Sequence, residues 1–286
     1  MSLIYDVSFD STTRILSLLD KAGNVISSCE VPSKGDPLTL TATADNSSVK
    51  LIMKGTLSNT YEVNVGSGWT AYEFGTVIPL NAGESCKWRC KSHPTTQNTN
   101  NYVQFKMTGK IEASGNCNSM LSSDFESITS LTGYVCAFRN LFRDCTSLTQ
   151  APSLPATTLA DDCYDAMFMG CSSLTKAPEL PATKLVNSCY AYMLYGCKSL
   201  TQAPSLPAKF LTHSSYYVMF AYCKSLKEVR IAATAKDSYA LDAWLVDVSA
   251  TGDFYCDPNA TIFPTGKSGI PSGWTRRNIA DYPVTP

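Results

Sequence analysis

The sequence has no long apolar run. No window approaches the roughly 20 consecutive apolar residues that a membrane-spanning helix needs. The first residues, MSLIYDVSFDSTTRILSLL, lack the basic stretch followed by an apolar segment that marks a signal peptide. We therefore expect neither insertion into a membrane nor export by the usual route.

The sequence also lacks an excess of charge of either sign. Its 23 basic and 24 acidic residues leave a formal net charge of -1. A chain with this balance has no long-range field to attract nucleic acid or an anionic bilayer, so neither is an expected partner. The 286 residues are 44% hydrophobic, which is ample for a packed core.

Motifs of catalysis are missing as well. His93 and His213 are the only histidines. No glycine-rich phosphate loop, nucleophile elbow or paired-carboxylate motif occurs in the sequence. We therefore expect a protein that is not an enzyme, with no catalytic residues and no cofactor.

Cysteine, in contrast, is abundant and periodic. Cys145, Cys171, Cys197 and Cys223 follow one another at intervals of 26 residues, and other residue types keep the same interval. Repetition at this length is typical of a solenoid, in which each unit buries its apolar face against its neighbours. The leucine column has the same role in the predicted core and comprises Leu148, Leu174, Leu200 and Leu226.

Each repeat unit reads as a short helix followed by an extended segment. In CYDAMFMG, Tyr164, Met167 and Phe168 have the i, i+3, i+4 spacing of one helix face, and Gly170 stands where a left-handed C-cap would lie. Asp161 and Asp162 are expected to cap the amino end of this helix. The alternation predicts an α/β leucine-rich-repeat solenoid with a 26-residue period.

Metal binding is a less favoured explanation of the cysteines. Equivalent residues of stacked units form a line, whereas zinc ligands must converge on one point. The segment CKWRCKSH offers Cys86, Cys90 and His93, but strand residues four apart lie about 13 Å from each other. We therefore predict buried, reduced cysteines and no metal site.

The part before the repeats reads as β structure. Residues 1–35 show a first strand pattern, IYDVSF, followed by two more, RILSLL and VISSCEV, around the turn Asp20 to Asn24, and we interpret them as an attachment segment too small to stand alone. Residues 36–112 contain short alternating strands and predict a β-sandwich-like domain. Residues 113–286 form the predicted solenoid, and the tail from Leu241 is expected to leave the repeat register as its cap.

Two stretches resemble a known family. MFMGCSSLTKAPELPATKL and ATGDFYCDPNATIFPTGKSGIPSGWT resemble BspA-like leucine-rich-repeat proteins of gut anaerobes and their phages, and together with the preceding β segment the resemblance covers roughly residues 50 to 275. The resemblance implies adhesion or recognition by an exposed face and carries over no catalytic residues. The opening residues resemble the amino-terminal segments that join phage fibres to a virion.

These resemblances lead to a functional hypothesis with an alternative. The first reading is a phage virion protein, a head or tail fibre or appendage assembled in the host cytoplasm. It would bind other virion proteins through its first residues, form a homo-oligomer, and display its repeats to a host-surface glycan or protein. The alternative is a bacterial cell-surface adhesin.

The expected ligand-binding face follows the extended segments of four successive repeats. Because alternate residues of an extended segment point to opposite sides, at least one residue of each adjacent pair should face outwards. Tyrosines beside the predicted helices, Tyr192, Tyr195, Tyr216, Tyr217 and Tyr222, could add contact area. The plain alternative is that all are solvated surface or core-edge residues. The predicted face comprises Thr149, Gln150, Thr175, Lys176, Thr201, Gln202, Lys227 and Glu228.

Overall fold

The computed structural model describes residues 6–10, 15–19, 22, 25–30, 35–93 and 97–282. The chain divides into two compact units, Met1–Asp36 and Pro37–Pro286. In the first unit, β1 (Asp6–Asp10), β2 (Ile15–Leu19) and β3 (Val25–Glu30) form an antiparallel sheet in the order β1-β2-β3. Most of the predicted turn from Asp20 to Asn24 lies outside the described residues.

The second unit begins with two sheets built from residues 37–116, which we call the two-sheet region, and β12 from further along the chain joins the edge of the larger sheet. The larger sheet has the strand order β12-β11-β4-β9-β6-β7, and the smaller has the order β10-β5-β8. The strands are β4 Leu38–Ala42, β5 Ser47–Lys54, β6 Thr60–Asn64, β7 Trp69–Ala71, β8 Ile78–Leu80, β9 Ser85–Ser92, β10 Tyr102–Thr108, β11 Ile111–Ser114 and β12 Leu148–Gln150.

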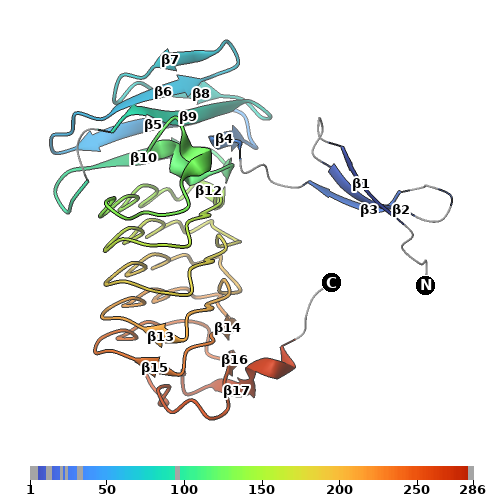
Figure 1. The fold of residues 1–286 in the computed structure, drawn as a ribbon, viewed down its shortest axis with the longest axis vertical. Coiled ribbons are helices and arrows are strands. Elements are labelled where there is room, and N and C mark those ends of the chain that lie inside the picture. Colours follow the sequence, from blue (N-terminus) through green and yellow to red (C-terminus); the bar gives the residue numbers. More distant parts are fainter. Residues whose placement is uncertain are drawn as a thin grey trace. The chain divides into compact units, whose positions relative to one another are not determined.

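The two sheets bury a shared core between them (Figure 1). In β4, Leu38, Leu40 and Ala42 are buried while the residues between them are partly exposed, as the period-2 pattern predicts. The ring of Trp88 in β9 meets the ring of Phe105 in β10 edge to face at 5.1 Å between centroids. Contacts of this kind add to the burial of apolar area that holds the sheets together.

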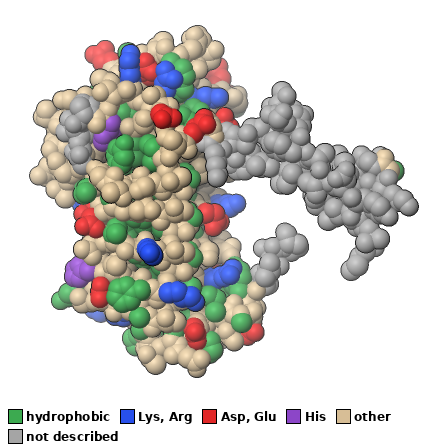
Figure 2. Space-filling model, in the orientation of Figure 1, with side chains coloured by type: hydrophobic (Ala, Val, Ile, Leu, Met, Phe, Trp, Pro, Cys, Tyr) green, Lys and Arg blue, Asp and Glu red, His purple; other side chains and the backbone are tan. Residues whose placement is uncertain are grey.

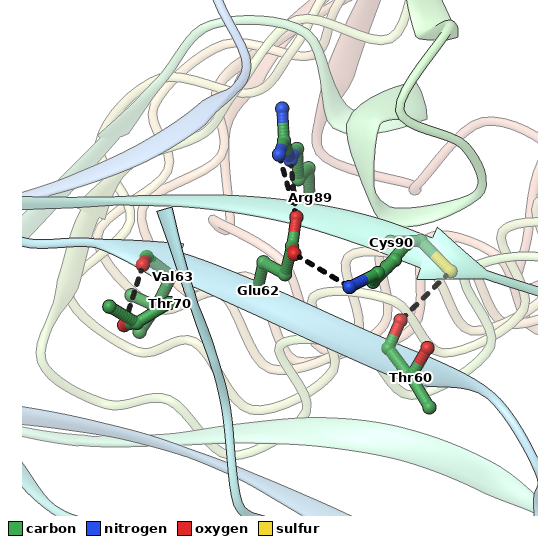
Figure 3. A network of polar contacts seen from close by, with 7 residues as sticks. Thr60, Glu62, Val63, Thr70, Arg89 and Cys90 are labelled. Atoms are coloured by element: carbon green, nitrogen blue, oxygen red, sulfur yellow. Dashed lines mark hydrogen bonds and ion pairs between the residues drawn. The ribbon is translucent and has the colours of Figure 1, made fainter. Parts of the chain in front are cut away.

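The outer face of β9 is charged, as expected from its alternation. Lys87 and Lys91 are exposed, whereas Cys86, Trp88 and Cys90 on the same strand are buried. On the neighbouring β6, the Glu62 carboxylate accepts a hydrogen bond from Arg89 at 2.8 Å (Figure 3). A second Glu62 oxygen lies 3.4 Å from Lys91 Nζ. This network ties β6 to β9 on the solvent side of the larger sheet.

The predicted α/β leucine-rich-repeat solenoid is wrong. Within residues 35–93 and 97–282 the regular structure is almost entirely β, with no α-helix and only the short 3-10 turns η1 (Cys117–Met120), η2 (Phe125–Ser127) and η3 (Ile279–Asp281). Instead, residues 117–282 run as successive flat coils stacked on the two-sheet region (Figure 1). We call this part the stacked-coil region.

Backbone hydrogen bonding explains why the predicted helix at Cys163 to Gly170 does not form. The N–H of Met167 bonds the carbonyl of Tyr164 in its own coil, but the N–H of Phe168 bonds Met193 in the next coil. This alternation continues along the segment, so the i to i-4 ladder of an α-helix is absent there. Every fourth residue adopts a left-handed backbone, namely Asp162, Ala166 and Gly170.

The predicted helix cap is therefore also wrong. Asp162 has a φ of 54° and occupies one of the left-handed positions. Asp161 does use its carboxylate as an acceptor, but its donor is the backbone N–H of Asn187 in the next coil, at 3.1 Å. Its role is to join two coils and not to begin a helix.

Columns of aromatic rings connect the coils with the two-sheet region. Phe105 of β10 stacks on Phe142 at 5.3 Å, and Phe142 stacks on Phe168 at 5.4 Å. The Phe105 N–H also bonds the Leu141 carbonyl at 2.7 Å. Both sheets thus continue into the first coil, the smaller through Phe105 and the larger through the pairing of β11 with β12, and the boundary predicted at residue 112 lies inside the compact unit Pro37–Pro286.

The coil pattern continues into the tail that was expected to leave the repeat register. Left-handed residues recur at Tyr239, Ala243 and Asp247, each 25 residues after its counterpart at 214, 218 or 222. The shorter interval hides this coil from a search at a fixed period of 26. The Trp244 ring joins the two aromatic columns, with its centroid 6.5 Å from that of Tyr216 and 6.2 Å from that of Phe220. The remaining strands are β13 Phe210–Leu211, β14 Glu228–Arg230, β15 Ala235–Lys236, β16 Gly252–Cys256 and β17 Trp274–Asn278.

Candidate ligand-binding face

The eight residues of the predicted face lie in one line of extended segments across four coils. β12 contains the first pair, Thr149 and Gln150, and parallel bridges join Gln150 to Lys176 and Gln202 to Glu228. The residues are exposed except Thr149 and Glu228, which are half-buried. Backbone bonds set the spacing, for example from the Thr175 N–H to the Thr149 carbonyl at 3.1 Å.

Part of this face is hollowed into a pocket of about 340 Å³, which we call the coil-face pocket. It contains four residues of the predicted face, two from each of two successive coils. The other four, Thr149, Gln150, Lys227 and Glu228, are not among the residues that line it. The lining residues are Thr175, Lys176, Ala177, Glu179, Thr201, Gln202, Ala203, Pro204, Ser205, Arg230 and Tyr282.

A hydrogen-bonded network forms one wall of the coil-face pocket. The Tyr282 hydroxyl donates to Glu228 Oε1 at 2.6 Å, and Gln202 Nε2 donates to the same oxygen at 2.5 Å. Gln202 also bonds the Tyr282 oxygen. The Arg230 guanidinium lies over the Tyr282 ring, with Cζ 4.6 Å from the centroid. These contacts hold Gln202, Arg230 and Tyr282 in place before any ligand binds.

The titration of Tyr282 is consistent with a fixed hydrogen-bond donor. Partial burial and the adjacent Glu228 carboxylate raise the pKa of Tyr282 to about 12. The phenol therefore stays protonated near neutral pH and keeps donating to Glu228. It is not set up to act as a general base there.

Sequence reasoning missed four polar residues of the coil-face pocket. Glu179 and Ser205 stand 26 residues apart and could have been found by extending the periodic comparison beyond the Thr-Gln pairs. Arg230 follows Glu228 by two residues in β14 and so shares its side of the strand. Tyr282 lies outside the periodic part of the sequence, which contains no signal for its approach to the coils.

The repeat-core residues are buried as a set. The thiol of each periodic cysteine lies near a carbonyl of the preceding coil or sheet, such as Cys171 Sγ to Phe142 O at 3.0 Å and Cys197 Sγ to Phe168 O at 3.3 Å. Burial raises the pKa of Cys145 to about 12, and that of Cys223 likewise. The set consists of Cys145, Cys171, Cys197, Cys223, Leu148, Leu174, Leu200 and Leu226.

The described residues include neither a metal-binding cluster nor a membrane-spanning helix. Within them, the structure places no three His, Cys, Asp or Glu side chains so that they could share a metal ion. In particular, Cys86 and Cys90 are both free thiols on the buried face of β9. In the same residues, no helix is long and apolar enough to span a membrane.

The tyrosines beside the coils divide into two groups. Tyr216 is 1% exposed and stacks on Tyr190 at 5.9 Å, so it belongs to the core. Tyr192, Tyr195 and Tyr222 form a partly exposed chain of ring contacts, with centroid distances of 6.3 Å and 5.1 Å. Tyr217 joins this chain at 5.3 Å from Tyr192. These rings are not among the residues that line the coil-face pocket.

A larger hollow of about 700 Å³ lies in the two-sheet region, between Gly66, Pro79 and Lys87. None of the predicted face residues lines it. Its wall includes the turn after β6 and the edge strand β8, and Val65 there is 52% exposed. The coil-face pocket is the stronger candidate because its polar groups converge and are held by one another.

The surface and the comparisons with known proteins add little to this choice. Figure 2 shows acidic and basic side chains interspersed on the face drawn, with polar surface between them. No protein-family model, curated protein or solved structure matches the chain. The geometry of the coil-face pocket is therefore the basis for inferring function.

Proposed function

We propose that this chain is a non-enzymatic recognition protein that binds its ligand in the coil-face pocket. The observation that carries the proposal is the convergence of Thr175, Lys176, Thr201 and Gln202 on one pocket with the braced pair Arg230 and Tyr282. A small number of fixed polar groups around a concavity is the usual form of a ligand site.

The chemistry of the lining supports binding over catalysis. Neither histidine lines the coil-face pocket, and the periodic cysteines are buried beneath the coils with raised pKa values. Tyr282, whose pKa is raised to about 12, serves as a donor to Glu228. Threonine, serine and glutamine side chains hold ligands by hydrogen bonds without needing activation.

We further propose that this recognition takes place on a phage virion, in a fibre or appendage attached through the first compact unit. The resemblance of the opening residues to fibre attachment segments supports this setting. So does the size of the unit, because a three-stranded sheet is close to the lower limit of independent stability and gains from a partner. A bacterial cell-surface adhesin remains the second candidate, favoured by the resemblance of the repeats.

Blocking the pocket tests the binding role directly. Thr201→Trp should fill the coil-face pocket and reduce binding of the purified protein to host cells at least tenfold. Thr146→Trp adds the same ring to an exposed threonine that does not line the pocket and should bind as wild type. Equal binding by both variants would place the ligand elsewhere.

Mass spectrometry separates the two settings. We expect the intact chain in purified phage particles at a fixed ratio to capsid protein. Recovery only from the cell envelope of the bacterium would instead favour the adhesin. Deletion of residues 1–36 should then remove the chain from particles while the second unit stays folded, and retention of the shortened chain would contradict the attachment role.

A further inference from the structure

The coil-face pocket combines donors and acceptors of both charge types. Lys176 and Arg230 can only donate hydrogen bonds, and the Glu179 carboxylate can only accept them at neutral pH. Among the described residues, no ion pair or hydrogen bond engages the side chains of Lys176 and Glu179, although they stand three residues apart on one coil. Both groups are therefore available to a ligand.

The hydroxyl and amide groups of the pocket extend this mixture. Thr175, Thr201 and Ser205 each carry a hydroxyl that can donate and accept, and Gln202 offers an amide beside them. The Thr175 hydroxyl donates to the Thr149 carbonyl, which leaves its oxygen lone pairs as acceptors. The apolar part of the lining is small and consists of Ala177, Ala203 and Pro204.

This combination discriminates between classes of ligand. An anionic group would be matched by donors alone, and Glu179 would repel it. A cationic group would be matched by acceptors alone, and Lys176 and Arg230 would repel it. Sugar hydroxyls need both, since each donates one hydrogen bond and accepts others. A peptide anchor would require a larger apolar cavity than three small side chains provide.

We propose that the ligand of the coil-face pocket is a neutral, hydroxyl-rich saccharide unit of a cell-surface glycan. Lys176 and Arg230 donate to its hydroxyl oxygens, Glu179 accepts from its hydroxyl hydrogens, and the braced Gln202 and Tyr282 wall fixes its orientation. This inference rests on the proposed recognition function and adds the chemical class of the ligand.

Two single variants, Lys176→Gln and Glu179→Gln, each remove one charge from the pocket. Their separate effects on binding distinguish a neutral ligand from an anionic or cationic one. Both side chains are exposed, so neither change should affect folding. For a neutral saccharide each variant loses a charge-assisted hydrogen bond, and each should weaken binding to host cells about tenfold. Lys198→Gln and Glu112→Gln, exposed and outside the pocket, are the matched controls and should bind as wild type.

Treatment of the host cells tests the saccharide itself. Periodate, which cleaves vicinal diols, should abolish binding, whereas proteinase K should leave it intact. Raising salt from 0.05 to about 0.5 M should change the affinity less than threefold, because screening acts little on a neutral ligand. Purified neutral cell-wall polysaccharide from the host should compete with the cells for the protein.

Each other outcome overturns the inference in a recognisable way. Tighter binding by Glu179→Gln together with weaker binding by Lys176→Gln would identify an anionic ligand and leave the proposed recognition function intact. Loss of binding after proteinase K alone would identify a protein receptor. Wild-type binding by Glu179→Gln, Lys176→Gln and Thr201→Trp together would refute both the saccharide and the pocket as the recognition site.

Discussion

The two-sheet region and the stacked-coil region satisfy their backbones by different rules. In the sheets, strands pair with partners at irregular distances along the chain, as in Leu38 with Trp88 and Leu51 with Phe105. In the coils, the N–H of Tyr164 bonds Cys189, and the N–H of Tyr190 bonds Ser215, so the separation is constant. A coil therefore depends mainly on its two neighbours, whereas a strand depends on the whole region.

This difference determines how damage should spread. A cavity in the two-sheet region weakens contacts among strands that are far apart in the sequence. Its effect should therefore reach many strands. A cavity in one coil removes contacts with the coil above and the coil below, as in other stacked repetitive structures. Mutations that create a cavity should therefore cost a similar free energy of unfolding in the two regions. They should differ in how far from the mutated residue the structure is destabilised.

Truncation of a core aromatic residue should have the largest effect in either region. Trp88 and Phe168 are both 0% exposed, and removing either ring by mutation to alanine should cost about 3–5 kcal/mol. Hydrogen exchange followed by mass spectrometry should show that Phe168→Ala lowers protection mainly in the coils next to it. Trp88→Ala should lower protection across β4, β9 and β10.

The pattern of exchange decides whether the two regions differ as described. Uniform loss of protection in the Phe168→Ala variant would mean that the whole second unit unfolds as one. Denaturant titration of the same variants supplies the free energies. Phe210→Ala, which truncates an aromatic residue that is 47% exposed, is the control and should change stability little.

The regions should also respond to pH with opposite signs. In the coils, burial raises the pKa of Asp165 from 3.8 to about 6, although Arg139 beside it acts in the other direction. The folded state then binds more protons than the unfolded state between these values. The stability that Asp165 contributes is full below about pH 4 and is lost as the pH rises through about 6.

Glu62 in the two-sheet region has the reverse dependence. Its hydrogen bond with Arg89 lowers the pKa of Glu62, so its contribution is present above the unfolded value of 4.5 and is lost as the pH falls. Asp165→Asn should remove a loss of up to about 3 kcal/mol between pH 4 and 7. Glu62→Gln in the otherwise wild-type protein should remove a gain in stability that occurs as the pH rises towards 4.5. The free energy of unfolding should then fall more steeply with rising pH in that range than it does in the wild type.

Denaturant titrations of the wild type and both variants from pH 3.5 to 8 test these signs. The Asp162 carboxylate, whose pKa burial also raises, shares Arg139 with Asp165, so the double variant Asp162→Asn with Asp165→Asn separates the contributions of the two carboxylates. An unchanged pH profile in Asp165→Asn would show that Arg139 keeps this carboxylate ionised in the folded protein.

The same contrast explains which parts of the fold could be predicted from sequence. Strand positions follow from period-2 alternation, and LTLTATA, YEVNV and CKWRCK overlap β4, β6 and β9. In the coils, Tyr164, Met167 and Phe168 satisfy a helix pattern, yet Asp165 and Ala166 between them are buried too. A fully buried segment loses the polar face that would reveal its true conformation.

Left-handed residues are the physical reason for the failed helix prediction. Ala166 has a φ of 52°, which an L-residue adopts only when surrounding contacts impose it. Its N–H bonds the Ala191 carbonyl in the neighbouring coil, a partner that no local pattern shows, while its carbonyl accepts from the Met169 N–H in its own coil. Part of the coil-face pocket was predictable because Lys176 and Gln202 repeat in register, whereas Tyr282 reaches it from a segment without periodicity.

A pair of glycines at equivalent coil positions gives the smallest and most specific test of this explanation. Gly170 and Gly196 have φ values of 78° and 71°, and the equivalent residues in other coils are Asp144 and Tyr222, also left-handed. Because the conformation is imposed by the stack, Gly196→Ala should be tolerated at a cost of about 1 kcal/mol. A Cβ there would meet no heavy atom closer than 3.9 Å.

Gly170→Ala should cost somewhat more, since its Cβ would come within 2.5 Å of Asp144 Oδ1. The exposed Asp144 carboxylate can rotate away, and the double variant Gly170→Ala with Asp144→Ala should return the cost to that of Gly196→Ala. Thermal or denaturant unfolding of the three variants measures these differences. A loss of several kcal/mol from Gly196→Ala would show that the local turn, and not the hydrogen bonds between coils, determines the left-handed backbone.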